Sequence, residues 1–447
     1  MLRPTPMRNA DKEGEMLVFI SDTHLTDGTS GTTIFPAAFD KFCRALEDIV
    51  WDPEKTNIRA VEIVLLGDII DVIRSALWLR RENGNPENPV RPWSDENLVD
   101  SAGWNLQTYT EAIVDAIVNR PDNIRAMRYL EDFRGRMADK GAEVTISYIV
   151  GNHDWLVNRY ESTRRKIAGF LGLENPFRFA DNRFPLEQVF KDYHVIARHG
   201  DYYDSMNYED NRDASSLGDA IVIDLLNKFP AAVEKDSVLG SNQELVGRLK
   251  EIDNVRPLLD IPVWLQGVCN EHPGVEERVH SIWNALVDEF FQMQFVRDHD
   301  RFGPDVTDFL ELALRLTSRF SFGRLMEIVG NKALRYYYSK SDDYKRYAYN
   351  EAALRSNLAR YVVYGHTHCA GQTPLDIVHI PGEGAVEKLY FNTGTWRKVF
   401  EHTTFDEEKC EFIGWHVMTF VLFYLESEKD KNRNYEVWSG SLGQGRK

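Results

Sequence analysis

The sequence lacks several features that define common protein classes. It has 4 cysteines in 447 residues and no Cys-x-x-Cys pair, so neither a zinc knot nor a disulfide framework is indicated. Its longest apolar run, around 417–425, is too short for a transmembrane helix, which needs about 20 residues. The polar N-terminus also lacks the apolar core of a signal peptide. A soluble, cytoplasmic protein is therefore expected, and nothing in the sequence indicates its oligomeric state.

Positive charge is scarce as well. The formal net charge of −17 argues against broad binding to nucleic acid or to an anionic membrane. Residues 315–360 are the exception, because they carry ten Lys and Arg against four Asp and Glu. Aromatic residues alternate with cations there, a pattern that can bind an anionic ligand or belong to a solvated amphipathic helix. The candidates for anion binding are Arg335, Lys340, Lys345 and Arg346.

Short runs rich in Val, Ile, Leu and aromatic residues predict strands. They cover Met16–Ser21, Val61–Leu66, Val144–Val150, His194–Arg198, Tyr361–Tyr364, Lys388–Asn392 and Phe412–Leu425, the last as a bent strand or a hairpin. Between the first three runs, apolar residues recur at helical spacing. This alternation of strand and helix favours an α/β layered fold whose sheets are covered by helices.

The stretch from about 202 to 360 has a different pattern. Helical periodicity dominates it, for example at Val279, Trp283 and Phe290, and no strand pattern interrupts it. The predicted organisation is an α/β domain formed by residues 1–201 and 361–447, with residues 202–360 as a helical insertion.

Five motifs rich in His, Asp and Asn each follow a predicted strand. They are Asp22-Thr23-His24, Gly67-Asp68 with Asp71, Gly151-Asn152-His153-Asp154, His199-Gly200-Asp201 and Gly365-His366-Thr367-His368. A single Asp-x-His is more often a hydrogen-bonded pair than a metal site. Five such motifs in this order instead offer enough carboxylate, amide and imidazole groups to hold two metal ions. Such a centre is suited to hydrolysing phosphate esters.

The motifs resemble those of the calcineurin-like metallophosphoesterase superfamily, which run Asp-x-His, Gly-Asp, Gly-Asn-His-Asp/Glu, His and Gly-His-x-His. The resemblance leaves out residues 202–360. It implies a four-layer αββα sandwich of two mixed sheets flanked by helices. It also implies two divalent metals, with Mn expected and Fe or Zn as alternatives. One metal would be held by Asp22, His24, Asp68 and His368, and the other by Asp68, Asn152, His199 and His366, with Asp68 bridging.

The same resemblance implies hydrolysis of a phosphodiester or pyrophosphate bond by in-line attack of a hydroxide held between the metals. His153 would be the general acid, and Asp154 would orient its imidazole. Asp71, Asp201 and Asp204 either orient the ligand imidazoles or are ordinary loop carboxylates. A nuclease, a phosphomonoesterase and a non-catalytic scaffold are the alternatives.

The residues between the motifs narrow the comparison within the superfamily. Protein Ser/Thr phosphatases carry Gly-Asp-x-x-Asp-Arg-Gly, whereas here Val72 and Ile73 stand in place of the Arg-Gly. The segments 67–71 and 199–204 instead resemble the bacterial branch of UDP-diacylglucosamine pyrophosphatase-like enzymes, which are considerably shorter. The expected partner is therefore a small or nucleotide-like phosphate ester.

Overall fold

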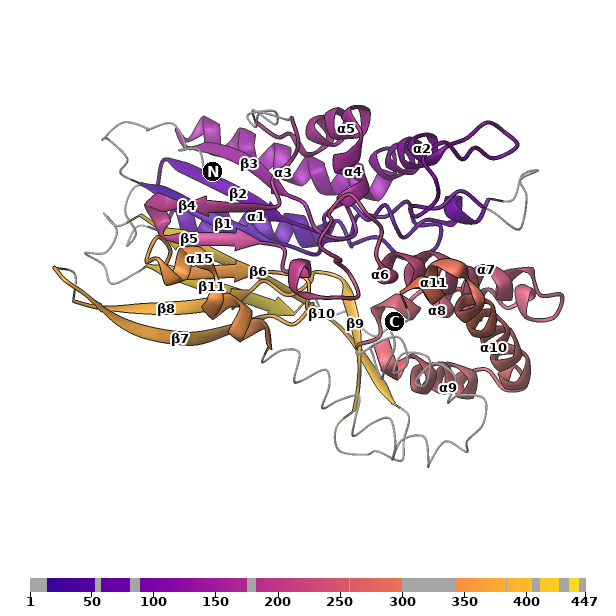
Figure 1. The fold of residues 1–447 in the computed structure, drawn as a ribbon. Coiled ribbons are helices and arrows are strands. Elements are labelled where there is room, and N and C mark those ends of the chain that lie inside the picture. The colour runs from indigo at the N-terminus through magenta and orange to yellow at the C-terminus, as the bar shows by residue number, and fades with distance from the viewer. Residues whose placement is uncertain are drawn as a thin grey trace.

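Two mixed β-sheets lie face to face between helices, and a further group of helices lies beside one end of the sheets (Figure 1). The computed structural model describes residues 14–52, 58–80, 89–174, 182–256, 258–299, 343–382, 384–403, 411–425 and 434–441. The predicted α/β class, with two mixed sheets flanked by helices, is confirmed.

The first sheet has six strands in the order β11-β10-β1-β2-β3, with β9 also paired to β10. Their bounds are β1 (Glu15–Ile20), β2 (Ala60–Leu66), β3 (Glu143–Ile149), β9 (Lys398–His402), β10 (Phe412–Tyr424) and β11 (Tyr435–Ser441). β1, β2 and β3 run parallel, while β10 is antiparallel to β1. Since parallel strands end at the same edge of a sheet, the three motifs that follow β1, β2 and β3 reach one place.

The second sheet has five strands in the order β4-β5-β6-β8-β7. Their bounds are β4 (Glu187–Phe190), β5 (Val195–Arg198), β6 (Tyr361–Tyr364), β7 (Gly371–Ile380) and β8 (Gly384–Asn392). β5 and β6 are parallel neighbours, so the two motifs that follow them also come together.

The seven predicted strands are all present. Phe412–Tyr424 is one continuous strand, and β8 begins at Gly384 rather than at Lys388. Four strands were not predicted, namely β4, β7, β9 and β11. β4, β7 and β11 lie at sheet edges and β9 pairs only with β10. None of the four has the continuous apolar run that marks a strand buried on both faces.

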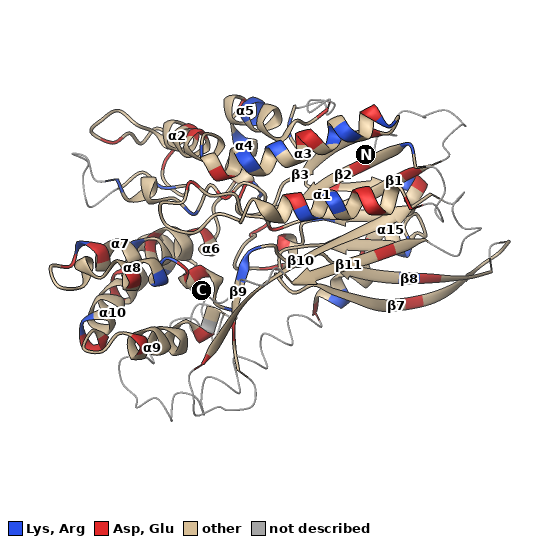
Figure 2. Ribbon diagram, turned by 180° about the vertical axis from the view of Figure 1, so that it is seen from behind, with Lys and Arg blue, Asp and Glu red and all other residues tan. Residues whose placement is uncertain are grey.

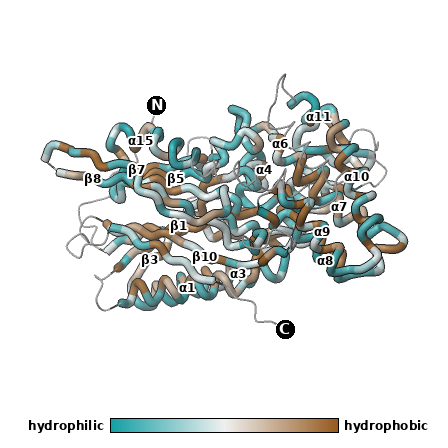
Figure 3. Tube along the Cα trace, turned by 90° about the horizontal axis from the view of Figure 1, so that it is seen from below, coloured by the Kyte–Doolittle hydropathy of each residue, from teal (hydrophilic) through white to brown (hydrophobic). Residues whose placement is uncertain are grey.

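The alternation of side chains along the inner strands builds two cores. In β1, Leu17 and Phe19 point between the sheets, whereas Met16, Val18 and Ile20 point toward the helices. Figure 3 shows hydrophobic residues along the strands of the first sheet. The far face of the second sheet packs against residues 343–350 and α15 (Ala352–Arg355).

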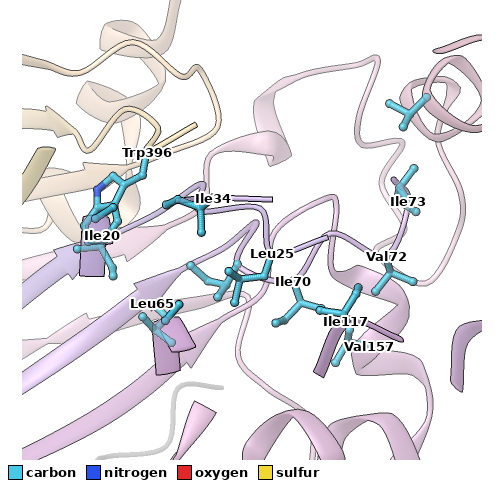
Figure 4. Packing of buried hydrophobic residues seen from close by; sticks show 14 of the residues in the cluster. Ile20, Leu25, Ile34, Leu65, Ile70, Val72, Ile73, Ile117, Val157 and Trp396 are labelled. Atoms are coloured by element: carbon cyan, nitrogen blue, oxygen red, sulfur yellow. The ribbon is translucent and has the colours of Figure 1, made fainter. Parts of the chain in front are cut away.

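Helices contribute their apolar faces to the core on the outer side of the first sheet, where α3 packs directly on β3 and the others pack on the sheet or on one another. They are α1 (Ala37–Val50), the short 3-10 helix Ala76–Leu79, α2 (Leu106–Val118), α3 (Pro121–Asp139), α4 (Trp155–Arg159) and α5 (Glu161–Leu171). Acidic and basic residues alternate along α1 and α3, as a solvated helix face requires (Figure 2). In the core below, Ile117 and Val157 lie beside Ile70, and Ile34 lies near Trp396 (Figure 4).

The part of 202–299 that the structure describes consists of helices joined by loops, as predicted, with an isolated bridge between Val255 and Phe400. Its helices are α6 (Leu217–Ala220), the π-helix Ile221–Leu226, α7 (Lys228–Lys235), α8 (Gln243–Leu249), α9 (Ile261–Glu271), α10 (Glu276–Gln292) and α11 (Gln294–Asp298). Three 3-10 turns lie between them, at Leu239–Ser241, Ile252–Asn254 and Leu258–Asp260. Across the described residues, no helix combines the length and apolar character needed to cross a membrane.

Candidate metal centre

The five motifs meet where strands of both sheets end. The Asp22 motif follows β1 and the His366 motif follows β6, and the backbone N–H of His366 donates to Asp22 Oδ2 at 3.1 Å. Next to this contact, the N–H of Gly365 donates to the carbonyl of His199 at 2.8 Å. Residues more than 300 positions apart in the chain thus form one site.

One set of donors consists of Asp22, His24 and His368, whose ligand atoms all lie within 4.8 Å of one another. His368 Nε2 is 3.3 Å from Asp22 Oδ1 and 3.2 Å from His24 Nε2. Asp68 Oδ2 lies 3.9 Å from His24 Nε2. These four residues are the set that the resemblance assigned to one metal, and the structure brings them together.

A second set consists of Asp68, His199 and His366, again within 4.8 Å of one another. Asp68 Oδ2 is 3.1 Å from His199 Nε2, and Asn152 Oδ1 is 3.0 Å from His366 Nδ1. Asp68 Oδ2 therefore lies next to both donor sets, as a bridging ligand would.

Two atoms of these sets are buried without any hydrogen-bond partner: Asp22 Oδ1 and His199 Nε2. An unpaired buried polar atom costs about 1–3 kcal/mol. His199 Nδ1 lies 2.9 Å from the carbonyl of Leu66, to which it can only donate, so Nε2 is the nitrogen left for a metal. The carboxylates of Asp68 and Asp22 outweigh burial and raise the pKa of this imidazole well above its usual range, so a metal at Nε2 would replace a proton. A cation in each donor set would give each of these two atoms a partner, so the donor sets fit metals.

The backbone at the candidate ligands is strained. A non-glycine residue with positive φ costs on the order of 1–3 kcal/mol and is found mainly where function requires it. Five candidate ligands adopt this conformation, namely Asp22 (φ 50°), His24 (46°), Asp68 (52°), His366 (66°) and His368 (60°). The surrounding strands thus hold these side chains in place at a cost to stability.

Gly151 shows how closely the loops approach one another. A Cβ atom at this position would lie 2.4 Å from Asp68 Oδ1 and 2.8 Å from the backbone N of Asp68. Because one of these neighbours is backbone, no rotamer change could relieve the clash. Only glycine therefore allows the loop after β3 to pass beside the proposed bridging carboxylate.

Asp71, rather than Asp154, contacts the imidazole of His153. His153 Nδ1 lies 2.9 Å from Asp71 Oδ1, and His24 Nδ1 lies 2.9 Å from Asp71 Oδ2. The carboxylate of Asp154 instead accepts from the N–H groups of Gly151 (2.6 Å) and Ile69 (3.0 Å) and from the Tyr148 hydroxyl. The prediction that Asp154 orients His153 is corrected accordingly. The side chain of Asp154 turns back onto its own loop. Asp71 contacts two imidazoles, which is the orienting role and not that of an ordinary loop carboxylate.

The charges around Asp71 act on the two imidazoles in opposite directions. Burial, helped by the Arg397 guanidinium, lowers the pKa of His24 to about 4, which favours the neutral ring that a metal ligand needs. Burial alone would also lower the pKa of His153, but the carboxylates of Asp71 and Asp68 outweigh it and raise that pKa to about 10. One carboxylate thus joins a neutral imidazole to a protonated one.

The segment after β5 also contacts the candidate ligands. Asp204 Oδ2 is 3.2 Å from His366 Nε2, and Asn152 Nδ2 donates to Asn207 Oδ1 at 3.2 Å. Asp204 and Asp201 were both proposed as orienting carboxylates; Asp204 contacts a candidate ligand, whereas Asp201 pairs with Arg212. Asn207 belongs to no motif, so nothing in the sequence marked it.

Arg256 was also missed by sequence reasoning. Its Nη2 lies 3.1 Å from His368 Nδ1. A guanidinium can only donate, so Nδ1 accepts and the proton of the neutral ring is on Nε2. A metal on Nε2 needs the opposite tautomer. The hydrogen bond from Arg256 to Nδ1 and the binding of a metal at Nε2 therefore compete.

A buried cluster of charges lies directly behind Asp71. Arg74 Nη1 and Arg397 Nη1 approach the same Asp253 oxygen at 2.8 and 3.0 Å, and Arg397 Nη1 is 4.0 Å from Asp71 Oδ2. Burial would raise the pKa of Asp253, but the two guanidinium groups hold it well below its usual range. Since these residues are far apart in the sequence, no local motif predicts the cluster.

Two of the four anion-binding candidates, Lys345 and Arg346, lie in the part of the chain that the structure describes. Arg335 and Lys340 lie outside the described residues, and Arg346 is 81% exposed and 3.9 Å from Asp343. Tyr344, which lies between Asp343 and Arg346 in the sequence, is buried, and its ring centroid is 6.2 Å from that of His366. Tyr347 stacks on Tyr203 at 4.4 Å. This part of the helix packs its tyrosines inward, as the amphipathic interpretation expected, and a substrate role for Lys345 or Arg346 stays a prediction.

Comparison with known proteins does not name a family. No family model matches the chain, and no curated protein matches it. What can be stated is chemical: the described residues contain three adjacent His/Asp groups that could hold metal ions. The third group, formed by His24, Asp71 and His153, is already joined by hydrogen bonds.

Proposed function

We propose that this chain is a dinuclear metal-dependent phosphoesterase of the calcineurin-like type, and that it hydrolyses a phosphodiester or pyrophosphate bond. The observation that carries the proposal is the position of Asp68 Oδ2, 3.9 Å from a nitrogen of the first donor set and 3.1 Å from a nitrogen of the second. Two donor sets that share one carboxylate are the arrangement used for in-line displacement at phosphorus.

Asp22, His24, Asp68 and His368 would hold one cation, and Asp68, Asn152, His199 and His366 would hold the other. When bound, the cations would neutralise charge on the phosphoryl oxygens and activate a water molecule. A mixed set of imidazole and oxygen donors suits Mn, Fe and Zn, with Mn as the expected occupant.

His153 is suited to protonate the leaving oxygen. Its backbone N–H donates to Asp68 Oδ1 at 2.8 Å, and its Nδ1 is held by Asp71. Its side chain is 14% exposed, whereas those of His24 and His199 are fully buried. His153 is thus fixed beside the bridging carboxylate while its ring is still accessible. A diester or pyrophosphate expels a poor leaving group, so an acid is most useful there.

The helical insertion, residues 202–360, would act as a cap that selects the substrate. Support comes from Asp204, Asn207 and Arg256, which reach three candidate ligands from this segment. Specificity in such enzymes resides in segments added around a shared scaffold.

The test compares several substrates with Mn²⁺ supplied: bis-p-nitrophenyl phosphate, p-nitrophenyl phosphate, a nucleotide-diphosphate sugar and single-stranded DNA. We expect the diester or the pyrophosphate to be hydrolysed fastest and Asp68→Asn to abolish the reaction. Asp132→Asn, on the exposed side of α3, is the matched control that should keep full activity. Absence of hydrolysis with Mn, Fe and Zn, or full activity in Asp68→Asn, would refute the proposal.

A further inference from the structure

A cavity of about 440 Å³ lies beside the candidate metal centre and includes none of its proposed ligands. It is enclosed by residues 28–36, the start of α3, the end of α8 with the turn that follows it, and the start of β9. Figure 2 labels α3, α8 and β9, which contribute residues to the cavity wall. A cavity of this size is within the range that holds a small organic molecule.

The lining is basic, although the chain as a whole is acidic. Five cations line it, namely Arg120, Arg125, Lys250, Arg397 and Lys398, whereas the acids that line it are Asp122 and Glu251. Three of the cations form ion pairs: Arg120 with Asp122 at 3.7 Å, Lys398 with Glu251 at 3.1 Å and Arg397 with Asp253 at 3.0 Å.

The other two cations are hardly compensated. Arg125 forms no ion pair or hydrogen bond with any residue that the structure describes. The nearest acid to Lys250 Nζ is Glu234, at 3.9 Å, and it does not line the cavity. The unpaired Arg125 and the weakly paired Lys250 together match the charge of one dianionic group.

The rest of the wall suits an organic ligand. Ile34, Phe35, Pro36 and Trp396 supply apolar surface, and Phe35 is 63% exposed. His416 also lines the cavity, and its ring bonds to the backbone of Trp396. A ligand could therefore pair its anionic group with the cations and pack its ring on Phe35.

We propose that this cavity is a second ligand site, for a small organic molecule that combines a dianionic phosphate-type group with an apolar ring. The inference goes beyond the phosphoesterase function and does not depend on it, because no proposed metal ligand lines the cavity. Arg397 separates the two sites, since it lines the cavity and lies 4.0 Å from Asp71 on its other side.

The probe is phenylphosphonate, which carries a ring and a dianion and has no ester bond to hydrolyse. Calorimetric titration of the full chain in EDTA removes any contribution from bound metal, and a repeat with Mn²⁺ shows whether the sites are independent. We expect a single site in EDTA, with binding weakened at least about tenfold, or about 1.4 kcal/mol, in the Arg125→Ala/Lys250→Ala variant.

Two further variants make the test specific. Arg128→Ala/Lys235→Ala removes an exposed arginine of α3 and an exposed lysine of the helical segment outside the cavity, and it should bind like the parent. Phe35→Ala should weaken phenylphosphonate while leaving inorganic phosphate unchanged. No saturable binding by the parent, or equal weakening in both double variants, would overturn the proposal. The experiment measures binding and not hydrolysis. If the chain proved to have no phosphoesterase activity, the binding result would still decide whether the cavity is a ligand site.

Discussion

The side chains around the candidate centre come from two regions that are built differently. Five of the seven candidate ligands at the strand ends have left-handed backbone, and Asp22 and Asp68 among them have almost no exposure. Asp204 and Arg256, from the segment after β5, reach the same site through side-chain contacts, and Asp204 has an ordinary extended backbone. The first region is fixed by the sheets, and the second only adjusts it. Changes in the first should therefore remove the centre, and changes in the second should tune it.

The largest effect is expected from Gly151→Ala. The new methyl group would collide with the side chain and backbone of Asp68, so the bridging carboxylate cannot stay where both donor sets need it. We expect both metals and all turnover to be lost, as measured by elemental analysis and hydrolysis of bis-p-nitrophenyl phosphate. Gly135→Ala on α3, where a Cβ meets nothing within 4 Å, is the control. Normal metal content in Gly151→Ala would contradict this prediction, because it would show that the loops at Gly151 and Asp68 can move apart without losing the metals.

His153→Ala should keep both metals but lose turnover. General acid catalysis contributes about 10²–10⁴-fold, and it matters most when the leaving oxygen needs a proton. The loss should therefore be large for an alkyl diester and much smaller for an aryl diester, with metal content unchanged. If both substrates lost the same factor, His153 would stabilise charge rather than donate a proton.

A smaller effect, of unusual sign, is expected from Arg256→Ala. The arginine holds His368 Nδ1 as an acceptor and places a positive charge beside a proposed metal ligand. Groups around metal ligands typically change affinity by about 10–100-fold. We expect the metal bound by Asp22, His24 and His368 to bind about tenfold more tightly in this variant, measured by competition with a chelator. Weaker binding would mean that Arg256 orients His368 for the metal.

The same contrast explains which features could be predicted from the sequence. Buried strands such as β1 and β2 can be recognised by their apolar runs. The candidate ligands directly follow these runs, so the strands and the ligands could both be predicted. The edge strand β7 alternates exposed and half-buried residues and gives no such run. The contacts of Arg256 and Arg397 join distant parts of the chain, so no local spacing encodes them. Asp154 was misassigned because adjacency in the motif suggested a contact, whereas its side chain turns back to the loop.

Asp260 in the helical segment sharpens the contrast further, because it should affect stability without affecting catalysis. Burial raises the pKa of Asp260 from 3.8 to about 7. The folded state then binds a proton that the unfolded chain has released, so stability falls as pH rises from about 4 to about 7 and stays low above that. One unit of pKa shift corresponds to about 1.4 kcal/mol, so the penalty above pH 7 is on the order of 2–4 kcal/mol.

Asp260→Asn keeps the shape of the side chain and removes the charge. We expect this variant to be more stable than the parent above pH 7 and nearly equal to it near pH 4, with unchanged turnover, measured by urea unfolding across pH. Asp236→Asn is a matched control of opposite sign. Hydrogen bonds from the Leu239 backbone and from Arg278 lower the pKa of Asp236 to about 2, so this carboxylate stabilises the fold when ionised. Its loss should destabilise the protein at neutral pH and matter less as pH falls toward 2. A gain from Asp260→Asn that was the same at every pH would show that burial of the charge is not its cause.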